Sequence, residues 1–231
     1  MLSFFGRGSA FSDSHNSAFF INGKDLIVID CPATTFQKIK RFDFSKFDNI
    51  YVLVTHTHGD HAGGIGTFLQ YLFFALNIKL TIVAPSIEVY DDLILLLTRI
   101  EGCESHWFNI ITSDNLNKSW FVSAIPTFHT ITLSNKCFGY ALNVDKHIVI
   151  YTGDTSTLKP FQNYINKNVL LYTEISYYKS DVHLFYEDIL PDLISISSNG
   201  TKVFLMHLDN EKEIAKIIQN TSIQLAPLYT E

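Results

Sequence analysis

The sequence is poor in cysteine, in charge and in long apolar runs, and each shortage excludes a class of protein. Three cysteines, Cys31, Cys103 and Cys137, stand singly in 231 residues with no C-x-x-C pair, so no disulfide framework is expected. Charged residues make up 17% of the chain, with a net charge of −6 and no sustained basic cluster, which disfavours a large nucleic acid as partner. A small anionic substrate stays compatible, because bound cations would offset this charge locally.

Membrane insertion and export are also disfavoured. The apolar stretch at residues 67–78 is too short to span a bilayer and is interrupted by Gln70 and Asn77. The first 17 residues lack the basic segment and long apolar run of a signal peptide. We therefore expect a cytoplasmic protein with no membrane contact, and a homodimer as the default state for a soluble chain so rich in aromatic residues.

The chain does contain a series of short β-branched and aromatic segments separated by turns. Strands are predicted at residues 17–21, 25–29, 50–54, 80–83, 120–125, 137–144, 147–151, 169–173 and 203–206. Helical patterns fit residues 64–76, 86–99, 186–197 and 211–219, the last following Asp209 and Asn210 as N-cap candidates. Short turns predict hairpins joining 19–21 to 25–29 and 141–144 to 147–150. With no Pro- or Gly-rich linker, residues 1–231 are predicted to form one α/β domain, a layered αββα sandwich of mixed sheets.

The strongest chemical signal follows the apolar segment at residues 51–54, which leads into His56-Thr-His58-Gly-Asp60-His61. Three imidazoles and a carboxylate within six residues are typical of metal ligands and are hard to explain as packing. Because side chains alternate along a strand, His56 and His58 are expected to project to one side, while the turn at Gly59 directs Asp60 and His61 elsewhere. One segment can thus supply two neighbouring metal sites; the alternatives are a polar surface turn or a mononuclear site.

This H-x-H-x-D-H pattern resembles the metallo-β-lactamase superfamily, and the resemblance extends over nearly the whole chain. His129 in Pro-Thr-Phe-His, Asp154 in Thr-Gly-Asp and His207 in Phe-Leu-Met-His are similar to the later ligand positions, and Asp30 to the family's early aspartate. The resemblance implies a four-layer αββα sandwich with two metal ions. One ion would be held by His56, His58 and His129, the other by Asp60, His61 and His207, with Asp154 bridging them.

The expected cofactors are two divalent ions. Ligation by nitrogen and oxygen alone suits zinc, with manganese or iron as alternatives, because no thiolate selects a softer ion. Such a pair would hold a bridging hydroxide as nucleophile, which Asp60 is a candidate to orient. Asp30 is predicted to orient a ligating imidazole, the alternative being a turn carboxylate at a strand end.

Glu174 and His183 form the candidate acid system. They resemble the glutamate and the non-ligand histidine of the phosphodiesterase branch that includes the tRNA 3′-processing endonuclease RNase Z, where such a pair assists departure of the leaving group. The surrounding residues differ from that branch, with Thr173 before the glutamate and Leu184-Phe185 after the histidine. The alternative interpretation is structural, with Glu174 in a local hydrogen bond and His183 capping the next helix.

Two further pairs of residues are candidates for the pocket. Residues 6–11, Gly-Arg-Gly-Ser-Ala-Phe, and the following His15-Asn16 are similar to the opening of the same branch, where His15 or Asn16 would line the pocket or form an ordinary turn. Tyr177 or Tyr178 would provide a stacking wall for a base, although core packing explains most aromatic residues.

These features favour a phosphodiesterase that uses a metal-bridging hydroxide on a small phosphodiester or nucleotide. Only 24 residues separate His129 from Asp154, too few for the tRNA-grasping arm of RNase Z. The alternatives are a carbonyl hydrolase, such as a lactonase or thioesterase, and a catalytically silent metal-binding module. The 24 residues after His207 disfavour a glyoxalase II thioesterase, and a complete ligand set argues against a silent module.

Overall fold

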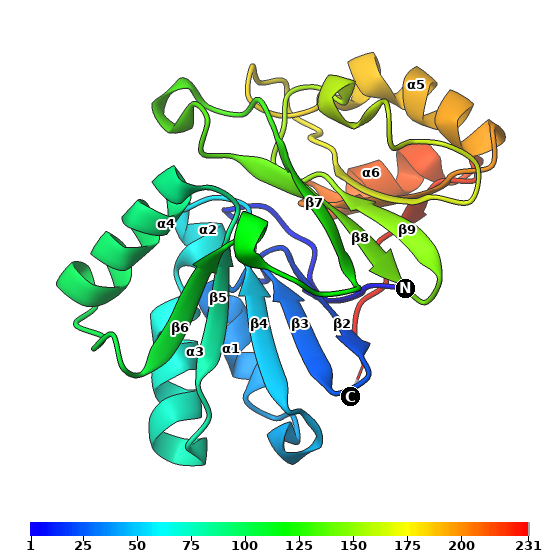
Figure 1. The fold of residues 1–231 in the computed structure, drawn as a ribbon. Helices are drawn as coiled ribbons and strands as arrows, with labels where there is room; N and C mark the ends of the chain where they lie inside the picture. Colours follow the sequence, from blue (N-terminus) through cyan, green and yellow to red (C-terminus); the bar gives the residue numbers. More distant parts are fainter. Residues whose placement is uncertain (231) are drawn as a thin grey trace.

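The computed structural model describes residues 1–230, and its strands form two mixed sheets of six strands each (Figure 1). The first sheet has the order β1 (Ser3–Gly6), β2 (Ser17–Asn22), β3 (Asp25–Ile29), β4 (Asn49–Leu53), β5 (Leu80–Ala84) and β6 (Phe108–Thr112). The second has the order β12 (Gln224–Leu225), β11 (Lys202–Met206), β10 (Leu170–Glu174), β9 (His147–Tyr151), β8 (Phe138–Val144) and β7 (Phe121–Pro126). Strands β3 to β6 and strands β9 to β12 run parallel, and the remaining neighbours run antiparallel.

Helices cover the outer face of each sheet. On the first sheet lie α1 (Ala33–Ile39), α2 (Gly59–Ala62), α3 (Ile65–Gln70) and α4 (Ile87–Ile94), with α3 and α4 continuing as the π-helical turns η2 (Tyr71–Ala75) and η3 (Leu95–Ile100). On the second lie α5 (Tyr186–Ser198) and α6 (Glu211–Ile218). The 3-10 turns are η1 (Phe44–Lys46), η4 (Ser113–Asn115), η5 (Ile131–Leu133) and η6 (Lys159–Phe161). The predicted αββα sandwich of mixed sheets is thus confirmed.

Three apolar layers hold these elements together. One lies between the first sheet and its helices, one between the two sheets, and one between the second sheet and α5 and α6. In the middle layer Tyr172 stacks on Phe4 and on Phe204, with ring centroids 5.5 and 4.7 Å apart. Burial of apolar surface on both faces explains why the central strands read as continuous apolar runs.

Both predicted hairpins are present. Strands β2 and β3 pair with Asn22 opposite Asp25, and Gly23 in the connecting turn has φ of +60°. Strands β8 and β9 are joined by Asp145 and Lys146, which both have positive φ. These backbone conformations match the twist of an antiparallel pair and fix the register of each hairpin. Among the described residues, no helix has both the length and the apolar character needed to cross a bilayer.

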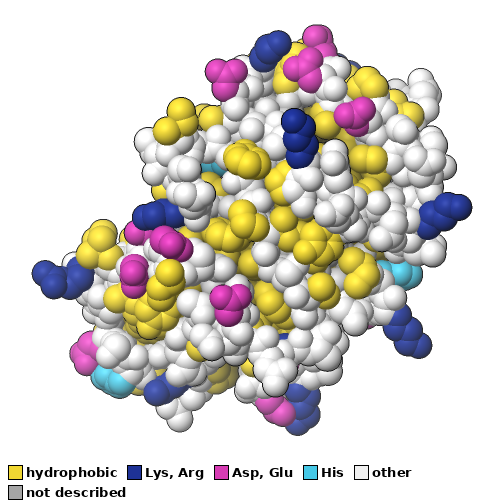
Figure 2. Space-filling model, turned by 45° about the horizontal axis from the view of Figure 1, so that its top comes forward, with side chains coloured by type: hydrophobic (Ala, Val, Ile, Leu, Met, Phe, Trp, Pro, Cys, Tyr) yellow, Lys and Arg dark blue, Asp and Glu magenta, His cyan; other side chains and the backbone are white. Residues whose placement is uncertain are grey.

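The strand directions bring the chemically active residues to one end of the sandwich. Within the first sheet, β3 and β4 end at the same edge, and within the second β7, β9, β10 and β11 do so, as the pairing directions require. Figure 1 shows β3, β4 and β5 pointing toward the top of the view. When that end is turned forward, hydrophobic side chains lie across the middle of the face and most charged side chains lie around its outline (Figure 2).

Candidate metal centre

The histidine motif lies in a loop and a one-turn helix. Strand β4 ends at Leu53, and the Asp30 carboxylate then accepts hydrogen bonds from the Thr55 amide and hydroxyl, both at 2.8 Å. His56 and His58 thus lie beyond the end of β4, so the alternation of side chains along a strand is not what orients them as predicted. The two rings nevertheless meet, with His56 Nε2 3.0 Å from His58 Nδ1.

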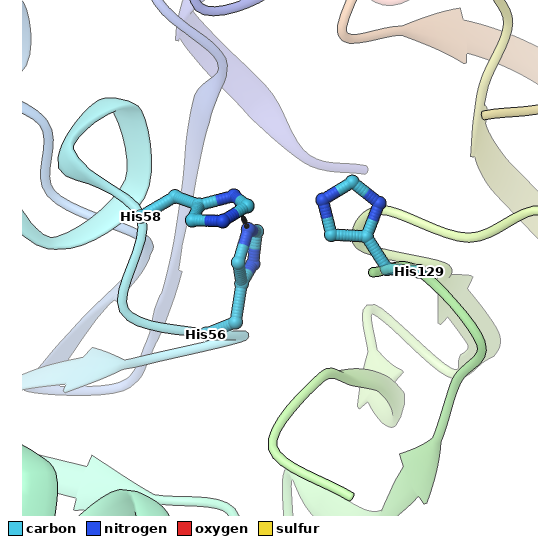
Figure 3. Close-up of side chains that lie close together, drawn as sticks. All are labelled: His56, His58 and His129. Carbon is cyan, nitrogen blue, oxygen red and sulfur yellow. Dashed lines mark hydrogen bonds between the residues drawn. The ribbon is translucent and has the colours of Figure 1, made fainter. Parts of the chain in front are cut away.

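The first group of donors consists of His56, His58 and His129. His129 lies in the loop after β7, and its ring approaches the other two from the opposite side (Figure 3). Its centroid is 5.3 Å from that of His56 and 5.2 Å from that of His58. Two nitrogens bound to one tetrahedral zinc ion at 2.0–2.1 Å would be about 3.3 Å apart. The spacing of the His56 and His58 nitrogens is close to that value, so the group suits a divalent ion.

The second group consists of Asp60 and His61 on α2 and His207 after β11. The Nε2 atoms of His61 and His207 each lie 3.3 Å from Asp60 Oδ2. Asp154 lies between the two groups, because its oxygens are 3.5 Å from His61 Nε2 and 3.7 Å from His129 Nε2. The structure thus brings together all seven predicted ligands, with Asp154 between the two groups.

Two buried atoms show that these residues suit a bound cation. His61 Nε2 and Asp154 Oδ1 are buried and have no hydrogen-bond partner among the described residues. Buried polar atoms without partners are rare, because each carries the cost of lost hydration. A divalent ion accepting both lone pairs would remove that cost, and imidazole and carboxylate donors fit zinc, manganese or iron.

Each of three imidazoles is oriented through its Nδ1 atom. His61 Nδ1 lies 2.8 Å from Asp30 Oδ2, His56 Nδ1 lies 3.1 Å from Thr55 Oγ1, and His129 Nδ1 lies 2.9 Å from the Val182 carbonyl. When Nδ1 carries the hydrogen toward these oxygens, Nε2 presents its lone pair to the cluster. Asp30 therefore lies where a residue that orients a ligand is expected.

Burial and charge set the protonation of the donors. Burial lowers the pKa of His56, of His58 and of His129, which favours the neutral imidazoles that bind metals. Burial alone would raise the pKa of Asp154, but His207 and His61 hold it well below its usual range. Burial opposes protonation of His61, but Asp154 and Asp30 outweigh it and raise the pKa of His61 well above its usual range. A metal ion at His61 would therefore displace a proton, whereas His56, His58 and His129 already favour the neutral form that coordinates metals.

Glu174 and His183 form a pair beside this cluster. Glu174 is the last residue of β10 and is fully buried, and its Oε2 lies 2.7 Å from His183 Nδ1. The His183 ring centroid is 4.9 Å from that of His129 and 5.3 Å from that of His207. Helix α5 begins with Phe185 as its N-cap, so the alternative in which His183 caps this helix is wrong.

The Glu174 carboxylate controls the charge of His183. Burial of the imidazole opposes protonation, but the adjacent carboxylate outweighs it and raises the pKa of His183 to about 9. His183 is therefore protonated at neutral pH in the absence of metal. Its Nδ1 is directed to Glu174, which leaves Nε2 as the atom able to donate a proton toward the cluster.

The structure places the remaining pocket candidates in different surroundings. Tyr178 lines a cavity beside His183, whereas Tyr177 stacks on Tyr186 with an interplanar angle of 4° and packs into the core under α5. Asn16 is buried and donates a hydrogen bond of 2.7 Å to the Tyr151 hydroxyl, so it does not line that cavity.

Three residues with roles at the site were not identified from the sequence. Thr55 links Asp30 to His56, Asp209 accepts hydrogen bonds from the turn that carries Tyr178, and Phe11 lines the cavity. Thr55 adjoins the histidine motif and Asp209 follows His207 by two positions, which are the signals that point to them. Asp209 is not the N-cap of α6; the Asn210 side chain fills that role by accepting a hydrogen bond from the Glu213 amide.

Comparison with known proteins places the chain in a family. The model of the family described as Anti-Pycsar protein Apyc1 matches residues 1–226. The Anti-Pycsar protein Apyc1 of Bacillus phage BSP38 is 27% identical over an alignment of 244 positions, which covers 90% of this chain and 88% of that protein. A metal-dependent hydrolase of Pyrococcus furiosus is 27% identical over 64% of this chain and 62% of its own length.

Solved structures show the same fold at lower identity. The metallo-β-lactamase fold protein YhfI of Bacillus subtilis superposes with a TM-score of 0.73 at 17% identity, over 97% of this chain and 94% of that one. The short form of human tRNase Z superposes with a TM-score of 0.66 at 17% identity, over 90% and 92% of the two chains. The predicted resemblance is therefore confirmed: the chain has the metallo-β-lactamase fold and belongs to the Anti-Pycsar protein Apyc1 family.

Proposed function

We propose that this protein is a dinuclear phosphodiesterase that hydrolyses a small phosphodiester, a cyclic nucleotide in the first instance. The observation that carries the proposal is the contact of 2.7 Å between buried Glu174 and His183, directly beside the two groups of metal donors. An alkoxide is a poor leaving group and needs a proton, whereas the leaving group of a strained lactone places less demand on an acid. A carboxylate–imidazole pair at this place therefore favours phosphodiester chemistry.

Metal binding, orientation of the ligands and proton donation would fall to different residues in such a reaction. Two divalent ions at the donor groups would supply Lewis acidity toward phosphoryl oxygens and lower the pKa of a water molecule. Asp30 and Thr55 fix the orientation of His61 and His56, so that the donor atoms are placed before substrate binds. His183, held by Glu174, is placed to give its Nε2 proton to the departing oxygen.

Substrate size is limited by the segment between His129 and Asp154. Residues 130–153 form η5 and the tight β8–β9 hairpin, where RNase Z enzymes typically insert the arm that holds tRNA. A small anionic substrate fits this arrangement better than a large nucleic acid. The name Anti-Pycsar suggests that the relatives degrade a cyclic nucleotide, which is a phosphodiester of the appropriate size.

The first test is turnover by zinc-loaded and manganese-loaded protein. The substrates are purine and pyrimidine 3′,5′-cyclic nucleotides, bis(p-nitrophenyl) phosphate, a p-nitrophenyl ester and a lactone. We expect metal-dependent hydrolysis of the phosphodiesters and no turnover of the lactone. Hydrolysis of the lactone or ester with silent phosphodiesters would contradict the proposal and make Glu174 and His183 structural.

The second test separates the acid from the metals. Glu174→Gln and His183→Ala should lower kcat for a cyclic nucleotide by about 10²- to 10⁴-fold, the usual contribution of general acid catalysis. The same variants should change turnover of bis(p-nitrophenyl) phosphate far less, because p-nitrophenolate leaves without a proton. The matched control is His147→Ala, which removes an exposed imidazole from β9. Equal losses on both substrates would show that the pair only supports the fold or the metals.

A further inference from the structure

A cavity of about 320 Å³ opens beside the metal centre and carries two exposed aromatic rings. His183 and His207 form part of its wall, and Phe11 and Tyr178 also line it. Phe11 is fully exposed and Tyr178 is 61% exposed. The volume lies at the lower end of ligand pockets, which span about 300–1,000 Å³, so the cavity suits a ligand of mononucleotide size.

The loop that carries Phe11 is fixed to the metal-binding segment. The Ser9 amide donates to the Leu208 carbonyl at 2.9 Å, and the Leu208 amide donates to the Arg7 carbonyl at 2.8 Å. Within the loop, a Cβ on Gly8 would lie only 2.4 Å from Ser12 Cβ, so this tight path requires glycine. Phe11 is therefore presented by an ordered, hydrogen-bonded loop that begins next to His207, and its ring is left in contact with water.

The turn that carries Tyr178 is held by hydrogen bonds to Asp209. The Asp209 carboxylate accepts hydrogen bonds from the Ser176 hydroxyl at 2.6 Å and from the Tyr177 and Tyr178 amides at 2.8 and 3.2 Å. Asp209 follows His207 by two residues, so the turn that bears Tyr178 is attached to the same segment as the Phe11 loop. Of the two neighbouring tyrosines, Tyr177 is used for packing and Tyr178 is left for the cavity.

We propose that this cavity binds the planar heterocyclic base of the substrate, with the rings of Phe11 and Tyr178 as its stacking surfaces. Aromatic rings carried by hydrogen-bonded loops stack on planar bases, and they do so for purines and pyrimidines alike because every base has a π-face. The position beside His183 allows a base to occupy the cavity while the attached phosphodiester reaches the metal centre. This assignment rests on the proposed phosphodiesterase function, since it names the part of the substrate remote from phosphorus.

Binding tests the assignment independently of turnover. Calorimetric titration of zinc-loaded protein with a nucleoside 5′-monophosphate and with ribose 5-phosphate isolates the contribution of the base. The wild-type protein should bind the nucleotide more tightly, by about 5- to 150-fold for a stacked base. Phe11→Ala and Tyr178→Ala should each lose most of that difference and leave ribose 5-phosphate binding unchanged. The matched control is Phe74→Ala, which removes an exposed phenylalanine on η2 and should bind both ligands as the wild type does.

The outcomes distinguish the base site from the reaction. Equal affinity of the wild type for both ligands, or unchanged nucleotide affinity in Phe11→Ala and Tyr178→Ala, would overturn the stacking assignment even if cyclic nucleotides are hydrolysed. Base-dependent binding that both variants abolish would support the assignment even if no phosphodiester is turned over, in which case only the proposed reaction fails. With an active enzyme, the variants should raise KM for a cyclic nucleotide and leave KM for ribose 3′,5′-cyclic phosphate unchanged.

Discussion

Replacing Asp30 by asparagine should weaken metal binding at one of the two donor groups and leave the fold intact. In the wild type, Asp30 Oδ1 accepts from the Thr55 amide, and Oδ2 accepts from the Thr55 hydroxyl and lies 2.8 Å from His61 Nδ1. Asparagine tolerates the positive φ of +59° at this position and can retain the bond from the Thr55 amide. Its NH₂ group, however, faces His61 Nδ1 and favours the tautomer with the hydrogen on Nε2, where it blocks coordination.

The expected loss is about 10- to 100-fold in the affinity of one metal site, as for other residues that orient a ligating histidine. The site affected most is the one that contains Asp60, His61 and His207, because Asp30 contacts His61 directly and reaches His56 only through Thr55. His129 is oriented by the Val182 carbonyl instead. Competition with a chromogenic chelator measures both dissociation constants. Dialysis against a dilute chelator should leave about one bound ion per chain where the wild type keeps two.

Asp25→Asn provides the matched control. The Asp25 carboxylate, like that of Asp30, accepts three hydrogen bonds, here from the side chains of Asn49, Lys118 and Trp120, outside the metal centre. Each substitution should destabilise the metal-free protein in urea by about 1.5–3 kcal/mol, the usual contribution of a hydrogen bond to a charged group. Only Asp30→Asn should alter metal binding. Two wild-type dissociation constants in Asp30→Asn would refute the assigned role of Asp30.

Three other outcomes follow from the same contacts. Chelator treatment should lower the thermal midpoint and zinc should restore it, because saturation at 100 times Kd contributes about 2.7 kcal/mol per site; an unchanged midpoint in scanning calorimetry would exclude a metal centre. In metal-free protein, the stability advantage of wild type over His183→Gln should be full below about pH 6.5 and fall as pH rises through about 9, because Glu174 overcomes burial and raises this folded-state pKa. Urea titrations across this range check the sign, and an advantage that grows with pH contradicts it. Gly8→Ala should displace the Phe11 loop, since the new Cβ would lie 2.4 Å from Ser12 Cβ, and calorimetry should show weaker nucleotide binding with full metal content.

The sequence predicted the central strands and missed elements that depend on distant contacts. Central strands are marked by continuous β-branched and aromatic residues, since burial on both faces demands them. Helix α1 was not predicted because it has seven residues, follows Pro32 without a side-chain cap, and contains two threonines. Strand β6 lies at the edge of its sheet and is only partly buried, so its apolar pattern is weak. Both elements form because the first sheet and its apolar layer supply partners for them.

The residues of the site were likewise predictable where local sequence decides their place and not where distant contacts do. Each predicted ligand after the first motif follows a strand, and parallel pairing brings strand ends together, so its place was predictable. The path through Thr55 was not, because the hydrogen bonds that end β4 come from Asp30, 25 residues earlier. Local sequence could also not separate Tyr177 from Tyr178, since their different environments are set by Asp209 and Tyr186.

Each sheet supplies some of the metal donors, and this arrangement links metal binding to the geometry of the substrate cavity. His56, His58, Asp60 and His61 follow the first sheet's β4, whereas His129, Asp154 and His207 follow strands of the second. Each donor group therefore crosses from one sheet to the other, so a bound ion would stabilise their contact at this end of the sandwich. Leu208 and Asp209 immediately follow His207 and hold the Phe11 loop and the Tyr178 turn. An ion that fixes His207 would thus also steady the loop and the turn that carry the two aromatic rings. We therefore expect metal loading to increase the affinity for a planar base beyond what phosphate contact alone explains.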